Sequence, residues 1–245
     1  MLISGAGRGL GAAVARAFAR EGAGVAINYF RSRDRAEALA SELGERAICV
    51  QADVRDQGAV QTMVEHVEST LGAPTTVVHN ALADYLFDSE ARDTLVTLSA
   101  SSLRAQSATA VEGALHLLQA AVPRMEAAGF GRVIFIGTNL VQNPVVPYHD
   151  YTAAKAALLA LTRTSAVELG PKGIHVNMVA AGLLRTTDAS AATPKAVFDQ
   201  IAEATPRRTV TSPAEVADAV LFFASPWARA VTGQNLIADG GLVFG

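Results

Sequence analysis

Strand-length apolar runs alternate with amphipathic helical patterns along almost the whole chain. The expected strands lack the polar and apolar alternation of a half-exposed sheet, which indicates that both of their faces are buried. Such strands, separated by helices, predict an α/β fold: a doubly wound parallel sheet (Rossmann fold) of about seven strands, covered by helices on both faces. The expected strands are Leu2–Ser4, Gly24–Tyr29, Ala47–Gln51, Thr76–His79, Val133–Gly137, His175–Ala180 and Asn235–Ala238. The expected helices are Leu10–Glu21, Arg33–Leu43, Gln57–Leu71, Val111–Met125, Tyr151–Leu169 and Ala214–Ala224.

Length and composition bound the class of protein. We expect one domain over residues 1–245, because no linker, repeat or low-complexity tract interrupts the pattern. Hydrophobic residues make up 50% of the chain and charged residues 18%, which suits a large core and subunit contacts and excludes a disordered chain. The net charge of −3, with no basic block, speaks against nucleic acid or an anionic membrane as a partner.

The remaining bulk features point to a soluble cytoplasmic protein. No secretory signal is visible, and no apolar stretch approaches the ~20 residues of a membrane helix. The one cysteine, Cys49, cannot form an internal disulfide and is expected to be a small buried hydrophobe. The first strand begins at Leu2 and is unusually short, which leaves open whether a few N-terminal residues are missing.

A glycine-rich loop, SGAGRGLG from Ser4 to Gly11, joins the first strand to the first helix. Gly5, Gly9 and Gly11 allow a tight turn and a close approach of the backbone to a pyrophosphate, which the N-terminus of the helix would bind. The spacing is not the strict G-x-G-x-x-G, so a plain glycine-rich turn is the alternative.

The end of the second strand predicts which dinucleotide binds. Tyr29 stands where an NAD site has an acidic residue for the ribose hydroxyls. Arg31 follows closely and Arg8 lies in the glycine loop, so guanidinium groups are available for a 2′-phosphate. We therefore expect NADP(H). A solvated helix start is the alternative for Arg33 and Arg35.

A second motif, YTAAK, places Tyr151 and Lys155 one turn apart on a helix. A nearby ammonium group is expected to lower the pKa of the phenol. Tyr151 then acts as the acid that protonates a carbonyl oxygen, or as the base that deprotonates an alcohol. The alternative is an ordinary amphipathic helix with a surface tyrosine and lysine.

Two segments depart from the strand and helix pattern. Residues Ala83–Gln106 are rich in serine, threonine and alanine, and Leu183–Lys195 is small and polar after a strand. Long loops at the carboxyl ends of parallel strands usually form substrate lids, so we expect the substrate pocket between these two segments.

Taken together, these motifs and four more resemble the short-chain dehydrogenase/reductase family, most closely its 3-oxoacyl-acyl-carrier-protein-reductase-like branch. The further motifs are Asp53-Val54, Asn80-Ala81, VNMVAAG followed by Thr186, and the C-terminal TGQNLIADGG. The resemblance implies that Asp53 contacts adenine, that Lys155 also binds the nicotinamide ribose, and that the ADGG segment helps to build a tetramer. The cofactor residues it implies are Ser4, Gly5, Arg8, Gly9, Leu10, Gly11, Arg31, Asp53, Val54, Asn80, Ala81, Tyr151, Lys155, Gly182 and Thr186.

The chain departs from the family pattern around the expected catalytic residues. Thr138 stands thirteen residues before Tyr151, where the family has serine, and keeps the hydroxyl donor. Ala110 takes the place of an asparagine that anchors a relay water, which puts that relay in doubt. Polar residues that are candidates to replace it are Asn139, Gln142, His149 and Asp150. Smaller departures are His79 for asparagine, Leu82 for glycine and Ala181 for proline.

The leading hypothesis is an NADPH-dependent carbonyl reductase or alcohol dehydrogenase with Tyr151, Lys155 and Thr138 as catalytic residues. Its substrate would be a small ketone or alcohol, and a 3-oxoacyl thioester is one candidate. The alternative is a dinucleotide-binding sensor or scaffold with little turnover, because Ala110, Thr138 and Leu82 all depart from the pattern. A homotetramer or homodimer is expected. No metal is expected, because the histidines lie in different elements without ligand spacing.

Overall fold

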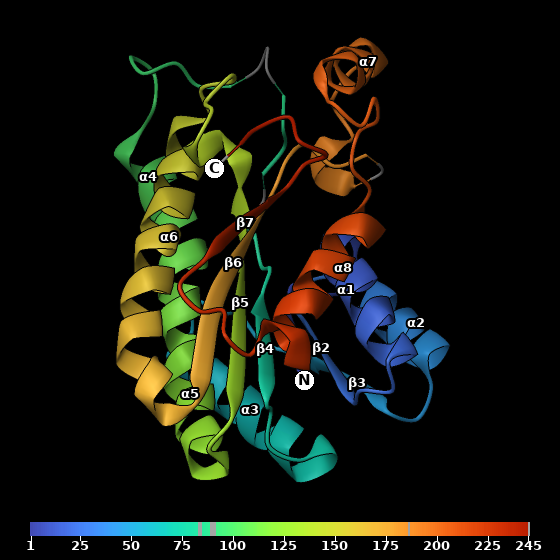
Figure 1. Ribbon diagram of the computed structural model, residues 1–245, viewed down its shortest axis with the longest axis vertical. Helices are drawn as coiled ribbons and strands as arrows, with labels where there is room; N and C mark the ends of the chain where they lie inside the picture. Colours follow the sequence, from blue (N-terminus) through green and yellow to red (C-terminus); the bar gives the residue numbers. More distant parts are fainter. Residues whose placement is uncertain (83–84, 89–91, 186, 245) are drawn as a thin grey trace.

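The computed structural model describes residues 1–82, 85–88, 92–185 and 187–244. Seven strands form one sheet in the order β3-β2-β1-β4-β5-β6-β7 (Figure 1). Every neighbouring pair is parallel, so the doubly wound sheet predicted from the sequence is confirmed. The strands are β1 Leu2–Ser4, β2 Val25–Tyr29, β3 Ala47–Gln51, β4 Thr76–His79, β5 Gly131–Thr138, β6 Ile174–Ala181 and β7 Asn235–Ala238.

Helices cover both faces of the sheet because the strands are apolar on both sides (Figure 1). On one face lie α1 Gly9–Arg20, α2 Arg33–Leu43 and α8 Pro213–Ala224. On the other lie α3 Gln57–Leu71, α5 Gly113–Ala128 and α6 His149–Leu169. Two further helices, α4 Ala100–Ser107 and α7 Lys195–Ala204, stand beside this arrangement.

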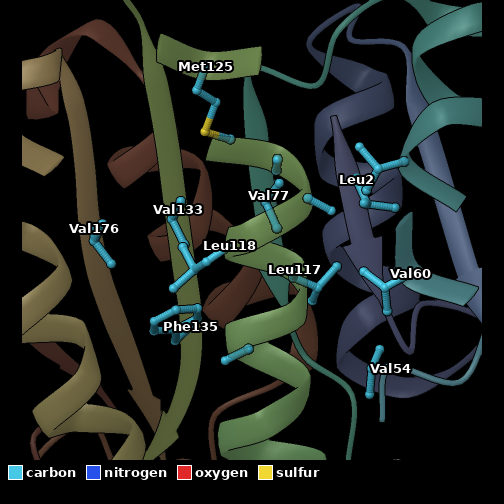
Figure 2. Close-up of a cluster of buried hydrophobic side chains, with 14 of the residues drawn as sticks. Leu2, Val54, Val60, Val77, Leu117, Leu118, Met125, Val133, Phe135 and Val176 are labelled. Atoms are coloured by element: carbon cyan, nitrogen blue, oxygen red, sulfur yellow. The ribbon is translucent and has the colours of Figure 1, made fainter. Parts of the chain in front are cut away.

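Alternate side chains of β5 illustrate why two cores form. Val133 and Phe135 belong to the cluster that includes α3, α5 and α6, and Figure 2 shows them beside Leu118 of α5. Ile134 and Ile136 point to the opposite face and belong to the cluster built with α1, α2 and α8. A strand that is apolar at every position therefore buries both faces at once.

The chain reverses its winding between β1 and β4, which are neighbours in the sheet although β2 and β3 separate them in sequence. The crevice of a doubly wound sheet lies outside the carboxyl ends of the strands at this reversal. The segments that follow β4 and β6, together with α7, gather at one end of the sheet (Figure 1). Ligands are therefore expected at this end.

The structure differs from the sequence prediction in three places. Helix α7, which comes directly after the polar loop and buries no residue fully, was not expected. The long helix ahead of β5 is preceded by α4 and by a π-helical turn, Ala108–Glu112. Cys49 is a free thiol that is only half buried, although it packs against the core on the α2 side. Within the described ranges, no helix is both long enough and apolar enough to cross a membrane.

Candidate active site

Glycines shape the turn between β1 and α1 because side chains would not fit there. Gly5 has φ of +62°, and a Cβ at this position would lie 2.8 Å from the Cα of Ala81. A Cβ on Gly11 would lie 2.6 Å from the carbonyl oxygen of Gly5. Gly9 opens α1 with φ of +55°. The loop therefore packs against the end of β4 and turns directly into the helix.

The amino end of α1 presents backbone N–H groups suited to an anion. Arg8 stands at the N-cap with an extended backbone, and its side chain makes no capping hydrogen bond. Leu10 is buried in the core, so only its backbone can face a ligand. The open N–H groups and the helix dipole both favour a negative charge at this end. The turn and these N–H groups together form a cradle that suits the charge of a dinucleotide pyrophosphate.

Ser4 and Asn80 hold the glycine loop against β4. The hydroxyl of Ser4 accepts hydrogen bonds from the backbone N–H groups of Asn80 and Ala81, at 3.0 Å each. The side-chain amide of Asn80 donates to the carbonyl oxygen of Gly5 at 2.9 Å. Because Ser4 is fully buried, its side chain positions the loop and cannot itself contact a ligand.

The arginines expected to receive a 2′-phosphate have partners of their own. Arg8 and Arg35 both pair with the carboxylate of Asp188, with N–O distances of 2.7 and 2.5 Å. The hydrogen bonds from Arg35 and Arg8 hold the pKa of Asp188 below its usual range. The guanidinium of Arg31 lies over the ring of Phe30, 5.2 Å from its centroid. A cluster of basic groups is present, but one acidic residue from the segment after β6 partly neutralises it.

Asp53 and Val54 follow β3 with different surroundings. The carboxylate of Asp53 accepts hydrogen bonds from Nε and Nη2 of Arg55 at 2.9 and 2.6 Å. The hydrogen bond from Arg55 lowers the pKa of Asp53. Val54 is buried beside α5, where a Cβ on Gly113 would lie 2.8 Å from its Cγ2. Val54 thus supports the site from within the core, and Asp53 remains the more accessible of the two.

Tyr151, Lys155 and Thr138 lie together where α6 packs against the carboxyl end of β5. Thr138 ends β5, and its hydroxyl lies close enough to the phenol of Tyr151 to interact with it. Lys155 donates from Nζ to the carbonyl oxygen of Ile136 at 2.7 Å and lies 5.8 Å from the centroid of the Tyr151 ring. The side chains of Tyr151, Lys155 and Thr138 are all buried. The structure therefore brings together the three residues that the sequence predicts to be catalytic.

The pKa of Tyr151 moves in the direction opposite to the sequence expectation. Burial raises the pKa of Tyr151 to about 12, with the interaction with the Thr138 hydroxyl acting the other way. Burial also lowers the pKa of Lys155 to about 8. Removal from water disfavours each charged form, and the hydrogen bond of Lys155 goes to Ile136 and not to the phenol. The phenol of Tyr151 is therefore neutral at pH 7.

Two aromatic rings, those of Tyr85 and Phe87, cover Tyr151, and the ring of Tyr148 packs against both of them. The ring of Tyr85 stacks on the ring of Tyr151, with centroids 5.3 Å apart and planes inclined by 25°. The ring of Phe87 meets the ring of Tyr151 edge-on, with centroids 5.2 Å apart. The same Phe87 ring also meets the ring of Tyr148 edge-on, with centroids 5.5 Å apart. The phenol of Tyr85 donates to Asp150 at 3.2 Å, and the same carboxylate oxygen accepts from the backbone N–H of Tyr151 at 2.8 Å. This cover keeps the Tyr151 ring dry.

The segments after β4 and β6 meet above the site. The backbone N–H of Phe87 donates to the carbonyl oxygen of Ala189 at 2.9 Å. The hydroxyl of Thr193 donates to the carbonyl oxygen of Phe87 at 3.1 Å. Thr187 lies over the glycine loop, 3.8 Å from where a Cβ on Gly9 would be. The segment after β6 thus contacts both the expected cofactor cradle and the aromatic cover.

Most of the polar residues weighed as substitutes for the relay asparagine are engaged elsewhere or exposed. Asn139 is buried and donates to Asp239 at 2.9 Å. Asp150 accepts from Tyr85 and from the backbone of Tyr151. Gln142 is exposed, and His149 lies half buried in the first turn of α6. Ala110 is buried in the π-helical turn.

The end of β6 leads into the remaining residues expected near the nicotinamide. Gly182 follows β6, and a Cβ there would lie 3.1 Å from both Asn139 Nδ2 and Asp239 Cβ. Thr186 lies outside the described residues. A cavity of about 200 Å³ opens beside the end of β5. Asn139 and a mainly apolar group, Val145, Ile201, Leu242 and Val243, line it. Such a lining suits an apolar portion of a substrate.

Sequence reasoning missed several residues that shape the site. Tyr85 and Phe87 lie in a segment that was expected to form a pocket wall, but nothing in its spacing indicated contact with Tyr151. Asp188 was overlooked because its ion pairs join residues far apart in sequence. His79 was noted only as a departure, and its position at the end of β4 was the one available signal. Within the described ranges, no three His, Cys, Asp or Glu side chains gather as around a metal ion.

A glycine cradle at the switch point and a buried tyrosine–lysine pair define an oxidoreductase of the dinucleotide-binding α/β class. Similarity to known proteins agrees with this class. The family described as "Enoyl-(Acyl carrier protein) reductase" matches residues 5–243. The chain is 32% identical over 247 aligned positions to 3-oxoacyl-acyl-carrier-protein reductase FabG of Staphylococcus epidermidis, covering 98% of this chain and 97% of that one.

Solved structures give the same picture. A 3-oxoacyl-acyl carrier protein reductase of Brucella melitensis with bound NAD superimposes with a TM-score of 0.89 at 28% identity, over 100% of this chain and 90% of that one. A gluconate 5-dehydrogenase of Burkholderia cenocepacia in complex with NADP and tartrate gives 0.88 at 29% identity, over 98% and 93%. The chain belongs to the short-chain dehydrogenase/reductase family and resembles its 3-oxoacyl-acyl-carrier-protein reductase branch.

Proposed function

We propose that this protein is an NADPH-dependent carbonyl reductase that converts a ketone to an alcohol. The observation that carries the proposal is the buried group formed by Tyr151, Lys155 and Thr138 at the carboxyl end of β5. A neutral phenol held against a second hydroxyl is suited to donate a proton to a carbonyl oxygen. The similarity to 3-oxoacyl-acyl-carrier-protein reductases supports a 3-oxoacyl thioester as one substrate class.

The residues of the chain would divide the work. A bound nicotinamide would supply the hydride for the carbonyl carbon. Tyr151 would donate its proton to the carbonyl oxygen, and Thr138 would hold that oxygen by a hydrogen bond. Lys155, charged below its pKa of about 8, would stabilise the phenolate that remains. The aromatic cover of Tyr85, Phe87 and Tyr148 would exclude water.

The cofactor residues follow from the cradle. The N-terminal turn of α1, with Gly5, Gly9 and Gly11, would bind the pyrophosphate. Asp53 would lie at the adenine, and Asn80, Ala81 and Gly182 would support the nicotinamide half. Arg8 and Arg31 would favour a 2′-phosphate, and no acidic residue stands at the end of β2 to repel it. Because similar structures hold either NADP or NAD, the selectivity for NADPH needs its own measurement.

The proposal is tested by NADPH oxidation with an acetoacetyl thioester and a panel of simple ketones. The wild-type protein should turn over at least one substrate, and Tyr151→Phe should lower kcat by about a thousandfold or more while NADPH still binds. The matched control is Thr164→Ala, which removes a hydroxyl from an exposed position on the same helix. Unchanged turnover in Tyr151→Phe would refute this mechanism.

A second candidate is a dinucleotide-binding sensor or scaffold with little turnover. It is favoured by Ala110, which cannot hold a relay water, and by the ring of Tyr85 stacked on Tyr151. In this case the double variant Ala110→Asn and Thr138→Ser should raise turnover at least tenfold above that of the wild type. No gain on the ketone panel, with NADPH bound, would remove the main support for this candidate.

We further propose that residues 1–245 form one domain that both binds the dinucleotide and carries out catalysis. We also propose that the protein is cytoplasmic and assembles as a homotetramer or homodimer. Exposed apolar side chains such as Leu103 on α4, Leu115 on α5 and Val167 on α6 support self-association. Sedimentation velocity at micromolar concentration decides the assembly, and a stable monomer would contradict it.

A further inference from the structure

His79, the last residue of β4, is a fully buried histidine with polar partners on both sides of its ring. Its Nδ1 lies 2.9 Å from the hydroxyl of Ser4. Its Nε2 lies 3.1 Å from the carbonyl oxygen of Thr109 and 3.2 Å from that of Ala110. The imidazole thus joins Ser4, the first residue of the glycine loop, to the π-helical turn ahead of α5.

The partners decide where the proton of this imidazole lies. Carbonyl oxygens can only accept, so Nε2 carries the hydrogen and donates to the π-helical turn. The hydroxyl of Ser4 already accepts from the N–H groups of Asn80 and Ala81, so it donates its own hydrogen to Nδ1. Burial, with the nearby charge of Lys155, lowers the pKa of His79 to about 3. The ring is therefore neutral and held in one tautomer.

The surroundings leave the ring no freedom to turn. Phe135 of β5 meets it edge-on, with ring centroids 6.2 Å apart and planes at 88°. On the α5 side, a Cβ on Gly113 would lie 3.4 Å from Cε1 of His79. These neighbours, together with the hydrogen bonds at both ring nitrogens, hold the two hydrogen-bonding edges of the ring in fixed directions.

The π-helical turn that His79 holds packs directly against α6, which carries Tyr151 and Lys155. A π-helical turn places an extra residue in a helix and disturbs its regular hydrogen bonds, and such turns often occur at functional sites. The side chain at position 110 is a methyl group and cannot form a hydrogen bond that would order the turn. Donation from Nε2 of His79 is the side-chain contact that fixes the carbonyl oxygens of Thr109 and Ala110.

We propose that His79 is a positioning residue for the reaction: its Nε2–H orders the π-helical turn beside Lys155, and its Nδ1 orders Ser4 beneath the glycine loop. The imidazole couples the catalytic side of the site to the cofactor side through two separate hydrogen bonds. This inference rests on the proposed function, because it assigns the effect of His79 to the step that uses Tyr151 and Lys155.

Three variants separate the two edges of the ring. The amide of His79→Gln reaches as far as Nε2 and can donate to the turn, whereas the amide of His79→Asn lies near Nδ1 and can accept from Ser4. His79→Leu offers neither contact. We expect His79→Gln to keep kcat within about threefold of the wild type and to weaken NADPH binding, measured by NADPH fluorescence. We expect His79→Asn to bind NADPH normally and to lose about tenfold in kcat, and His79→Leu to show both losses.

A merely structural role would affect kcat and NADPH binding together, in proportion to lost stability. The proposal is overturned if His79→Gln and His79→Asn lose kcat equally, or if kcat in His79→Asn matches the wild type. The pH profile of kcat adds a readout: its alkaline limb should move by about half a pH unit or more in His79→Asn and stay in place in His79→Gln.

Amide hydrogen exchange separates a failure of this inference from a failure of the proposed function. If the wild-type protein reduces no ketone, or if Tyr151→Phe retains full activity, the proposed function fails and exchange alone decides the role of His79. Residues 108–114 should then exchange faster in His79→Asn and His79→Leu than in the wild type, and His79→Gln should restore slow exchange. Equal exchange in all three variants would show that His79 does not hold the turn.

Discussion

Lys155 donates a hydrogen bond from Nζ to the carbonyl oxygen of Ile136 across 2.7 Å, between α6 and β5. Only 3% of the lysine is exposed, so the ammonium group has little water to stabilise it. Burial lowers its pKa to about 8, within the range in which enzymes are assayed. The charge state of Lys155 should therefore appear in the pH dependence of the reaction.

We predict that kcat/KM for ketone reduction falls as the pH rises through about 8. The pKa of Lys155 lies below the usual lysine value, so the charge is present below pH 8 and lost above it. Lys155→Arg keeps its charge and should lose this alkaline limb, although the larger group lowers activity overall. If kcat/KM of Lys155→Arg still falls at the same pH as that of the wild type, a group other than Lys155 is titrating. Lys155→Met should reduce kcat/KM at pH 7 by about a hundredfold.

The aromatic cover gives a prediction about the acidity of Tyr151. Tyr85→Ala removes the stacked ring and lets water reach the phenol, so the pKa of Tyr151 should fall from about 12 toward its usual value near 10. Absorbance titration of tyrosinate, with Tyr151→Phe as the reference, measures the change. We expect Tyr85→Ala to lose about tenfold in kcat/KM because the site is no longer dry.

Tyr85→Phe is the matched control for this prediction. It keeps the stack and loses only the 3.2 Å hydrogen bond to Asp150, so it should stay within about threefold of wild-type activity. If Tyr85→Ala leaves the titration of Tyr151 unchanged, the cover does not control the acidity of the phenol.

The sheet, most helices and the expected catalytic group could be predicted from the sequence because each depends on local patterns. Strands apolar on both faces define the parallel sheet, and the i, i+4 spacing places Tyr151 and Lys155 on one side of α6. Thr138 was identified from the family pattern, by counting thirteen residues back from Tyr151. In the structure it is the last residue of β5, one residue beyond the expected strand.

What could not be predicted depends on contacts between distant segments and on burial. The pKa of Tyr151 rises because the side chain is buried, and the two rings that cover it, Tyr85 and Phe87, come from a segment without a periodic pattern. The Asp188 carboxylate meets Arg8 only after β6 and α1 are placed by the sheet. Helix α7 carries apolar residues at helical spacing, Val197, Phe198 and Ile201, so its pattern was available in the sequence but was not recognised.

The ion pairs of Asp188 predict a change in cofactor selectivity. Asp188→Asn should free Arg8 and Arg35 for a 2′-phosphate and lower the Kd for NADPH by about two- to fivefold, with the Kd for NADH unchanged. The gain is small because all three side chains are about half exposed. It should shrink in about 1 M salt, where surface charges are screened.

The control for this prediction is Asp199→Asn. It breaks a comparable exposed ion pair with Lys195 on α7, away from the glycine loop, and should leave the affinities for both dinucleotides unchanged. An equal change in NADPH and NADH affinity in Asp188→Asn would mean that Asp188 acts on the loop as a whole and not on phosphate recognition.

The close packing of the glycine loop predicts a loss of both stability and binding in Gly11→Ala. Its Cβ would lie 2.6 Å from the carbonyl oxygen of Gly5, so α1 must move away from β1, at about 1–3 kcal/mol of unfolding free energy. NADPH affinity should fall at least tenfold, because the N–H groups of α1 move with the helix. Gly58→Ala, at a helical position in α3 where a Cβ would meet only Asp56 Oδ1 at 3.4 Å, should leave affinity unchanged and raise stability by up to about 1 kcal/mol.

The buried imidazole of His79 predicts a pH dependence of stability that is separate from catalysis. Its pKa in the folded protein is about 3, below the 6.5 of an exposed histidine, so the unfolded chain binds the proton more readily. The stability is fully present above pH 6.5 and is lost as the pH falls toward 3, by up to about 1.4 kcal/mol for each pH unit. All other titrating groups should contribute the same pH dependence to the unfolding free energy in a variant that lacks this imidazole. The difference in unfolding free energy between wild type and His79→Gln, measured in urea between pH 7 and pH 4, should therefore shift steadily against the wild type below pH 6.5. If the unfolding free energies of the wild type and of His79→Gln change in parallel with pH, His79 takes up its proton in the folded protein as easily as in the unfolded chain.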